Sequence, residues 1–192
     1  MIKLHIGCGN KKLHGFTNVD IREDVDPDVV CDIANLGDKF DGDSVDLIYA
    51  CHVLEHFPSK ELTHYPHTFW KVLSSWYKAL KPGGILRLSV PDTEKYCKYY
   101  ILHNNLSNMQ SFFHGGQKYD HDVHLSSWDF KTMQEILHDM GFECHGLWDW
   151  RQTEHSHVDD YSQMYLPHMD KTNGILLSLN VEYKKRLDNP YE

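Results

Sequence analysis

The sequence lacks the features that mark several large classes of proteins. None of its apolar runs approaches the roughly 20 residues that a membrane-spanning helix needs. Its five cysteines form no C-x-x-C pair and three of them lie in or beside apolar runs, so we expect buried free thiols instead of disulfides. Lysine and arginine are scarce, with 19 of them against 28 acidic residues. The resulting formal charge of -9 argues against a nucleic-acid partner, whose phosphates require basic contacts.

Signals for export and for division into domains are also missing. The chain enters an apolar stretch at residues 2–6 without the basic and apolar regions of a signal peptide, which predicts a cytoplasmic protein. No linker rich in proline, glycine or serine interrupts it, and 192 residues can enclose one sizeable core. We therefore expect a single domain over residues 1–192 that acts on a small molecule, with no membrane partner and no indicated oligomeric state.

What the sequence does contain is an alternation of short apolar runs with helical patterns, which is typical of α/β proteins. Apolar residues at helical spacing predict helices at 68–80 and 129–140, the first ended by KPGG at 81–84 and the second by Gly141. Seven apolar runs are predicted strands: residues 3–6, 18–21, 28–31, 45–50, 85–90, 143–148 and 176–183.

A glycine turn follows the first predicted strand, and an acid, Asp20, ends the second. Residues 10–16, which connect them, would span only about 10 Å as a helix, whereas a strand is about 17 Å long. We therefore expect a largely extended connection. A pyrophosphate would then lack the helix N-terminus that normally holds it, which argues against a nicotinamide dinucleotide. S-adenosylmethionine, which has no phosphates, fits better: Gly7 and Gly9 allow its close approach, and Asp20 can accept hydrogen bonds from its ribose.

Five segments occur in a recognisable order over residues 2–92: IGCGN, NVDI, CDI, DGDSVDLIYACHVLEHF and LKPGGILRLSVPD. They resemble the motifs of class I S-adenosylmethionine-dependent methyltransferases, notably the small enzymes of the methyltransferase type 11 group. GGQ at 115–117 and DVH at 122–124 are similar to a continuation found in some members. The resemblance implies a Rossmann-like seven-stranded sheet, mostly parallel with one antiparallel strand near the edge.

This sequence departs from the family pattern in two places. Lys11 replaces the usual third glycine, and the first helix is reduced or absent. Because the chain begins at its first predicted strand, we also expect no N-terminal cap over the substrate. Another part of the chain would then have to form the lid.

The resemblance also implies the cofactor contacts. Gly7 and Gly9 would approach the methionine part and Asp20 the ribose, whereas Asp32 would meet the adenine amino group with Ile33 against the ring. Residues 50–52 would lie beside the sulfonium. The complete set of expected cofactor-binding residues is Gly7, Cys8, Gly9, Asn10, Asp20, Ile21, Asp32, Ile33, Cys51 and His52.

The segment HVLEH matches a second pattern. His52-x-x-Glu55-His56 has the spacing of the H-x-x-E-H zinc peptidases, in which one helix presents both histidines and the glutamate is the general base. A zinc hydrolase is therefore an alternative, although the motif follows a strand in a methyltransferase-like series. Further histidines are expected at the same edge of the sheet: His114, His121, His124, His155 and His157. Because no other compact ligand spacing occurs and methyl transfer requires no metal, we expect no metal site.

Two long connections are candidates for a lid. Residues 92–127 and 149–173 each exceed the roughly 12–15 residues of an ordinary loop, and both are rich in aromatic residues. They would leave the edge of the sheet at which ligands bind in α/β proteins. These side chains could surround a substrate and exclude water, although packing against the core is the ordinary role of most such residues.

The sequence therefore predicts methyl transfer to an oxygen or nitrogen nucleophile of a small molecule. His124 is the preferred general base, with Asp122 orienting it or binding substrate and with His52 and His121 as alternative bases. The remaining candidate substrate contacts are Gln117, His121, Glu55 and His56. A saccharide-like hydroxyl is implied by the resemblance only, and a non-catalytic protein that binds S-adenosylmethionine is an alternative.

Overall fold

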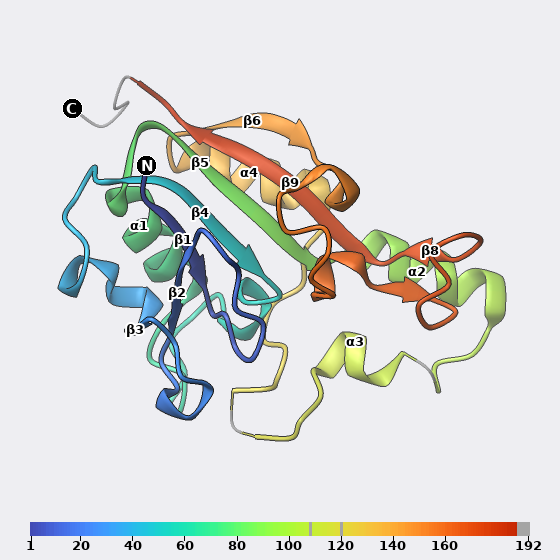
Figure 1. Ribbon diagram of the computed structural model, residues 1–192. Helices are drawn as coiled ribbons and strands as arrows, with labels where there is room; N and C mark the ends of the chain where they lie inside the picture. Colours follow the sequence, from blue (N-terminus) through green and yellow to red (C-terminus); the bar gives the residue numbers. More distant parts are fainter. Residues whose placement is uncertain (108, 120, 188–192) are drawn as a thin grey trace.

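One seven-stranded sheet runs through the molecule, as the computed structural model shows for residues 1–107, 109–119 and 121–187 (Figure 1). Its strands are β1 (Lys3–Ile6), β2 (Thr17–Asp20), β3 (Val29–Val30), β4 (Val45–Cys51), β5 (Leu80–Pro91), β6 (Phe142–Leu147) and β9 (Ser178–Lys185). The order is β3-β2-β1-β4-β5-β9-β6, and β9 runs antiparallel to both β5 and β6. The predicted mostly parallel sheet with one antiparallel strand near its edge is confirmed.

The order of the strands reverses between β1 and β4. From β1 the chain proceeds outward to β2 and β3, and it then returns to place β4 on the other side of β1. In open α/β sheets, ligands bind outside the carboxyl ends of the strands at such a switch point. The segments that follow β1, β4 and β5, which begin at Gly7, His52 and Asp92, therefore meet at the binding edge.

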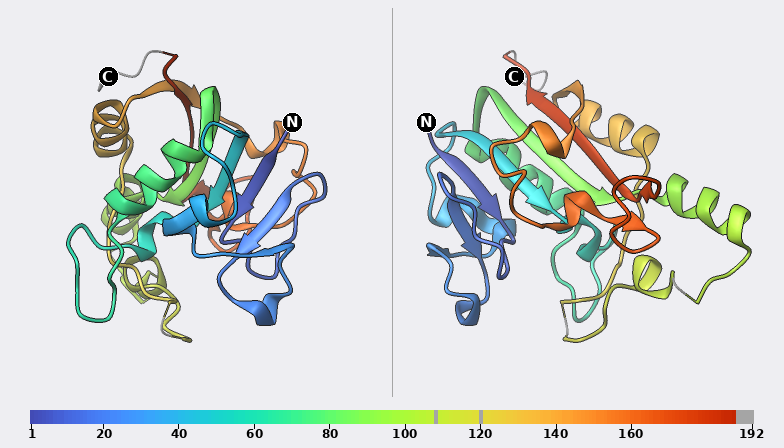
Figure 2. Two further views of the ribbon diagram at one scale, coloured as in Figure 1. Left: turned by 90° about the vertical axis from the view of Figure 1, so that its left-hand side faces the viewer. Right: turned by 45° about the vertical axis from the view of Figure 1, so that its right-hand side comes forward.

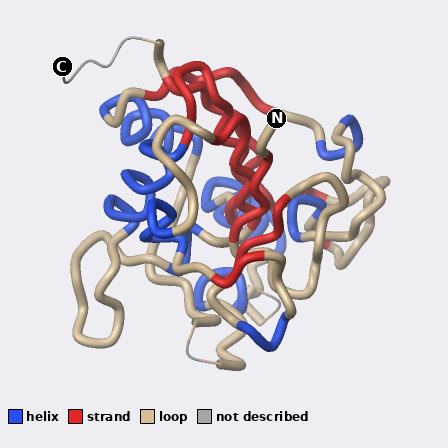
Figure 3. The backbone as a smooth tube through the Cα atoms, turned by 60° about the vertical axis from the view of Figure 1, so that its left-hand side comes forward, coloured by secondary structure: helices blue, strands red, loops and turns tan. Residues whose placement is uncertain are grey.

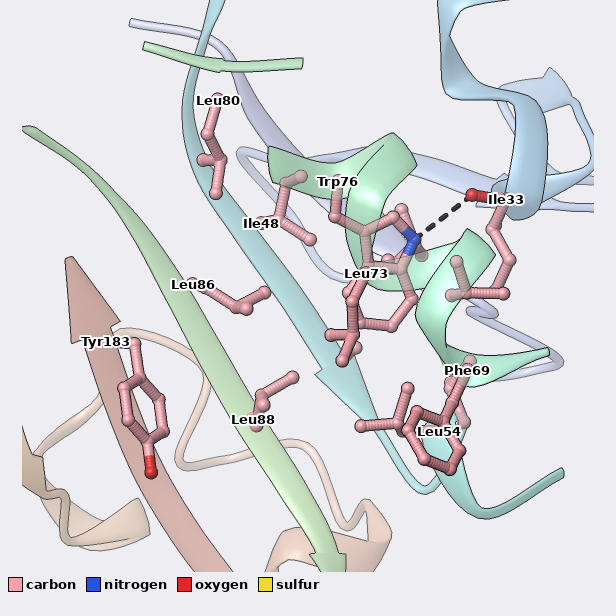
Figure 4. Packing of buried hydrophobic residues seen from close by; sticks show 14 of the residues in the cluster. Ile33, Ile48, Leu54, Phe69, Leu73, Trp76, Leu80, Leu86, Leu88 and Tyr183 are labelled. Atoms are coloured by element: carbon pink, nitrogen blue, oxygen red, sulfur yellow. Dashed lines mark hydrogen bonds between the residues drawn. The ribbon is translucent and has the colours of Figure 1, made fainter. Parts of the chain in front are cut away.

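Helices cover one face of the sheet, where α1 (Phe69–Ala79) and α4 (Phe130–Asp139) lie on the same side (Figure 2). Trp76 of α1 is fully buried, and its indole Nε1 donates to the Ile33 carbonyl at 3.1 Å (Figure 4). Both predicted helices are confirmed. The Thr68 side chain accepts a backbone N–H at the start of α1, and the Asp129 side chain does so at the start of α4. Helix α1 ends at Ala79, just before KPGG as predicted, and residues 81–84 lie in the first part of β5.

The opposite face is covered mainly by irregular chain, drawn tan in Figure 3. In β4, Ile48 and Ala50 face the helices, whereas Tyr49 and its neighbours of the same parity pack against residues 13–16 and 148–158. Residues 10–16 contain no helix, as predicted, so they lie along the sheet and bury Leu13 and Phe16. A strand that is buried on both faces reads as one apolar run, as VDLIYAC does.

The two long connections carry short elements of their own. The first contains α2 (Thr93–His103) and α3 (Gln110–His114), and the second contains the 3₁₀ turns Trp150–Gln152 and Tyr161–Gln163 and strand β7 (Tyr165–Leu166). β7 pairs with β8 (Ile175–Leu176), so the run predicted as one strand at 176–183 is divided between β8 and β9. Further 3₁₀ turns are Glu23–Val25, Ile33–Asp38 and Leu54–His56. No helix in the described part of the chain is long and apolar enough to cross a bilayer.

Candidate functional site

The glycine turn after β1 packs on the segment after β4. Gly7 has a φ of +63°, and a Cβ placed on it would lie 2.5 Å from a methyl group of Val53, so no side chain fits there. Gly9 differs, because its φ is +50° but a Cβ there would meet only the Arg22 guanidinium at 3.8 Å. The first glycine is thus required by the protein itself. Space above the second is open for a ligand.

Asp20 holds this turn in place from the end of β2. Its carboxylate accepts the Gly9 backbone N–H at 2.8 Å and the Arg22 backbone N–H at 2.9 Å. A carboxylate has about four acceptor positions, so acceptor capacity remains for two hydroxyl groups. This arrangement fits the ribose of S-adenosylmethionine.

Asp32 and Ile33 lie at the next corner, where Asp32 caps the 3₁₀ turn Ile33–Asp38. Its carboxylate accepts the Ala34 N–H at 2.9 Å and lies 3.0 Å from Nε2 of His67. His67 comes from the connection before α1, and sequence reasoning missed it because a single loop histidine carries no periodic signal. The Asp32 side chain is 29% exposed and Ile33 is buried beside it. An acceptor next to an apolar side chain suits an adenine ring with its amino group.

Residues 51–56 form the segment next to the glycine turn. His52 has a φ of +52°, which is an uncommon conformation for a residue with a Cβ. Its Nε2 lies 3.0 Å from the hydroxyl of Ser178, and its ring lies 5.3 Å from that of Tyr161. His52 precedes a 3₁₀ turn, Leu54–His56, and not an α-helix. The single-helix geometry required by the H-x-x-E-H peptidase alternative is therefore not formed.

Four side chains, His52, Glu55, His56 and His124, gather at this edge, and we call them the Glu55 cluster. Glu55 Oε1 lies 3.3 Å from His52 Nδ1 and 3.9 Å from His124 Nε2. The His56 and His124 rings are 5.3 Å apart. Sequence reasoning named all four residues but gave no indication that they touch.

Burial controls the charges of the Glu55 cluster. Loss of hydration raises the pKa of the fully buried Glu55 carboxyl to about 8 and lowers the pKa of His52 to about 3. Burial, followed by repulsion from His56, lowers the pKa of His124. Burial also lowers the pKa of His56. The imidazoles are therefore held neutral at neutral pH, which leaves lone pairs available on their ring nitrogens.

Backbone contacts fix the segment that carries His124. Its Nδ1 donates to the Phe112 carbonyl at 2.8 Å, and the N–H groups of Leu125 and Ser126 donate to the Glu55 carbonyl at 2.7 and 3.1 Å. Residues 123–126 are thereby joined to residues 54–56. The first long connection thus supplies a side chain to the binding edge.

The other predicted substrate residues lie in the turn that precedes this segment. The Asp122 carboxylate accepts the N–H groups of Gly116 and Lys118 at 3.1 and 3.2 Å. Gln117 is exposed and its backbone N–H donates to the Asp122 carbonyl, and His121 is also exposed. Asp122 therefore braces the turn, while Gln117 and His121 face solvent next to the Glu55 cluster in sequence.

Histidines after the sixth predicted strand do not join the Glu55 cluster. His155 is 3% exposed and its ring lies 4.6 Å from that of Tyr49 on the loop-covered face of the sheet. The Tyr49 hydroxyl donates to the Asp160 carboxylate at 2.6 Å, and Asp160 also accepts the Ser162 N–H at 3.0 Å. These groups tie the second long connection to β4.

Comparisons with known proteins agree with this geometry. The profile of a family described as methyltransferase domain matches residues 7–147. No curated protein matches the chain. A SAM-dependent methyltransferase from Methanosarcina mazei is 15% identical with a TM-score of 0.56, covering 97% of this chain and 92% of that one.

Two other solved structures share the fold at similarly low identity. An S-adenosylmethionine-dependent methyltransferase from Mesorhizobium loti is 15% identical, with a TM-score of 0.53 and coverage of 95% of this chain and 90% of that one. A protein from Pyrococcus horikoshii is 17% identical, with a TM-score of 0.56 and coverage of 96% and 81%. The glycine turn and the Asp20 acceptor both lie within residues 7–147, which the family profile matches. The chain belongs to the methyltransferase domain family and is a class I S-adenosylmethionine-dependent methyltransferase.

Proposed function

We propose that this methyltransferase modifies an oxygen or nitrogen nucleophile of a small molecule in the cytoplasm, with a saccharide-like hydroxyl as the favoured acceptor. The observation that carries the proposal is the close packing of Gly7 on Val53. It sets His52 and Glu55 beside the turn that borders the cofactor. A polar, water-poor cluster next to that turn suits an acceptor that must lose a proton.

The residues around the glycine turn would hold the cofactor. Asp20 would accept hydrogen bonds from the ribose, Asp32 would accept one from the adenine amino group, and Ile33 would pack on the ring. Gly9 leaves room for the methionine part. When bound, S-adenosylmethionine supplies an electrophilic methyl group on its sulfonium.

His124 is the proposed proton acceptor for a hydroxyl substrate. Its Nδ1–H is fixed on the Phe112 carbonyl, so the lone pair of the neutral ring lies on Nε2. Its side chain is 12% exposed, which allows contact with a substrate while excluding most water. A general base of this kind contributes about 10²–10⁴-fold to the rate. His52 and His121 are the alternative bases.

Substrate contacts are proposed along the first long connection and the Glu55 cluster. Gln117, His121 and Asp122 lie on the turn before His124, and Glu55 and His56 lie opposite it. Hydroxyl groups of a saccharide can donate to and accept from such side chains. The formal charge of -9 disfavours a nucleic acid as acceptor.

Calorimetry in buffer containing a chelator tests the cofactor part of the proposal. Wild-type protein should bind S-adenosylhomocysteine, and Asp20→Ala should lose that binding. Asp24→Ala, which removes an exposed acid from the following loop, is the control and should bind normally. Binding of NAD without S-adenosylhomocysteine would overturn the assignment.

Mass spectrometry of candidate acceptors incubated with S-adenosylmethionine tests the methyl transfer itself. A panel of small saccharides, amines and phenols should yield one class with a mass gain of one methylene. If a saccharide is the acceptor, that class carries the gain and the amines do not. A protein that binds the cofactor but modifies no acceptor in a wide panel would be a binding protein instead.

A further inference from the structure

Hydrogen bonds in the Glu55 cluster determine where each imidazole carries its proton. His56 Nδ1 lies 2.8 Å from the Val123 carbonyl and His124 Nδ1 lies 2.8 Å from the Phe112 carbonyl. A carbonyl only accepts, so both Nδ1 atoms are protonated in the neutral rings. Each neutral ring therefore carries its lone pair on Nε2.

The proton position on the His52 ring follows from its hydrogen bonds in the same way. The Ser178 hydroxyl donates to the Tyr161 carbonyl at 2.6 Å, so it has no hydrogen left for His52 and accepts one from its Nε2 instead. The lone pair of His52 is then on Nδ1, which lies 3.3 Å from Glu55 Oε1. When Glu55 is ionised, two electron-pair donors therefore face each other at short range.

A protonated Glu55 carboxyl can donate one hydrogen bond, to His52 Nδ1, but that single proton leaves the Nε2 lone pairs of His56 and His124 unserved. The Glu55 side chain is fully buried, and neither carboxylate oxygen has a hydrogen-bond partner among the described residues. A buried carboxylate in that condition is costly unless a positive charge or a metal satisfies it. One cation bound by Glu55, His56 and His124 would satisfy an oxygen of the carboxylate and a ring nitrogen of each histidine together.

We propose that Glu55, His56 and His124 bind a divalent transition-metal ion. One carboxylate oxygen and one ring nitrogen from each histidine all lie within 4.8 Å of one another. Two imidazoles and one carboxylate suit Zn²⁺, Mn²⁺ or Fe²⁺ better than Ca²⁺ or Mg²⁺, which prefer oxygen ligands only. Ligands of one such ion lie up to about 4 Å apart, so a small side-chain rotation would close the site.

The surroundings match those of metal ligands in two respects. Histidine ligands usually donate their other N–H to a carbonyl or carboxylate, as His56 and His124 do here. The two ligand segments are also held together, because the Ser126 hydroxyl donates to the Leu54 carbonyl in addition to the backbone bonds at Glu55. His52 Nδ1 lies 3.3 Å from Oε1, the same carboxylate oxygen that faces His124 Nε2.

The catalytic consequence of the ion rests on the proposed function. An ion at this place would bind the acceptor hydroxyl and lower its pKa, as Lewis-acidic metals do. His124 would then act as a metal ligand and not as the proton acceptor, because an Nε2 lone pair that binds the ion cannot also bind a proton. Metal binding itself can be measured without cofactor or acceptor, so failure of one proposal is distinguishable from failure of the other.

The test is calorimetric titration of chelator-stripped protein with Zn²⁺ and Mn²⁺, together with metal analysis after desalting. Wild-type protein should retain one ion per chain. Glu55→Gln and His124→Ala should each bind more than about 100-fold more weakly, since loss of even an outer partner costs 10–100-fold. His138→Ala removes an exposed histidine of α4, close to two acids, and should bind like wild type.

A melting curve separates lost ligation from lost folding. Metal-free Glu55→Gln should melt at or above the temperature of metal-free wild type, because the amide can donate to the lone pairs that face it. Added Zn²⁺ or Mn²⁺ should raise the melting temperature of wild type but not of this variant. Equal stoichiometry and affinity in wild type, Glu55→Gln and His124→Ala would overturn the proposal, as would a wild type that retains no ion.

Discussion

Replacing Gly9 by alanine distinguishes the effect of this residue on cofactor affinity from its effect on the free energy of unfolding. Its φ of +50° costs alanine about 1–2 kcal/mol of folding free energy. The new methyl group would meet only Arg22, at an ordinary contact distance of 3.8 Å, so no further loss is expected. In the free protein, Gly9→Ala should therefore lower the free energy of unfolding by about 1–2 kcal/mol.

Gly15 supplies a matched control for this substitution. It has a φ of +82°, and a Cβ there would meet nothing within 4 Å. Gly15→Ala should cost a similar free energy of unfolding, measured by urea denaturation, and should bind S-adenosylhomocysteine like wild type. Gly9→Ala should bind at least about tenfold more weakly, a loss of about 1.4 kcal/mol, because its methyl group occupies space that the ligand approaches.

Gly7→Ala extends the comparison to a glycine that the protein itself requires. The 2.5 Å approach to Val53 adds a packing cost of about 1–3 kcal/mol to the backbone cost. The order of stability should be Gly15→Ala, then Gly9→Ala close to it, and then Gly7→Ala well below. If Gly9→Ala keeps the wild-type affinity, the cofactor does not pass over that residue. If Gly7→Ala is no less stable than Gly15→Ala, the packing of the turn on Val53 is wrong.

Two further predictions concern the loop-covered face of the sheet. Burial lowers the pKa of His5 from 6.5 to about 4, so the unfolded chain binds this proton more readily and the free energy of unfolding should fall by about 3 kcal/mol between pH 6.5 and 4. His5→Gln should show a correspondingly smaller pH dependence in urea denaturation, and an unchanged slope would contradict this assignment. Tyr49→Phe removes a hydrogen bond to the buried Asp160 and should cost about 1–3 kcal/mol, with faster amide exchange in residues 149–163. Tyr161→Phe, at an exposed neighbour, should change neither quantity, and equal effects of the two substitutions would count against a role for the Asp160 contact.

The spacing of apolar residues predicted the part of the fold in which helices pack against the sheet. Val72, Leu73 and Trp76 recur at helical spacing because α1 buries one stripe against the sheet. The loop-covered face gave no such signal, because Phe16 and Trp148 come from irregular segments whose packing has no period. KPGG correctly predicted the end of α1, but its turn-forming residues concealed the start of β5, which begins at Leu80 and not at residue 85.

The Glu55 cluster shows where a motif stops being informative. The spacing His52-x-x-Glu55-His56 selects three of its members correctly, but it implies ligands on one helix with glutamate as the base. Here only Glu55 and His56 lie in a 3₁₀ turn, which His52 precedes. Glu55 is buried among the histidines, and His124 belongs to a segment that begins 67 positions after His56. The proton positions on the three histidine rings depend on the carbonyls of Val123 and Phe112 and on the Ser178 hydroxyl. No spacing rule relates these groups to Glu55. Chemistry at this edge is therefore encoded by the contacts of the first long connection, and substitutions that shift residues 123–126 should affect the cluster as strongly as substitutions within the motif.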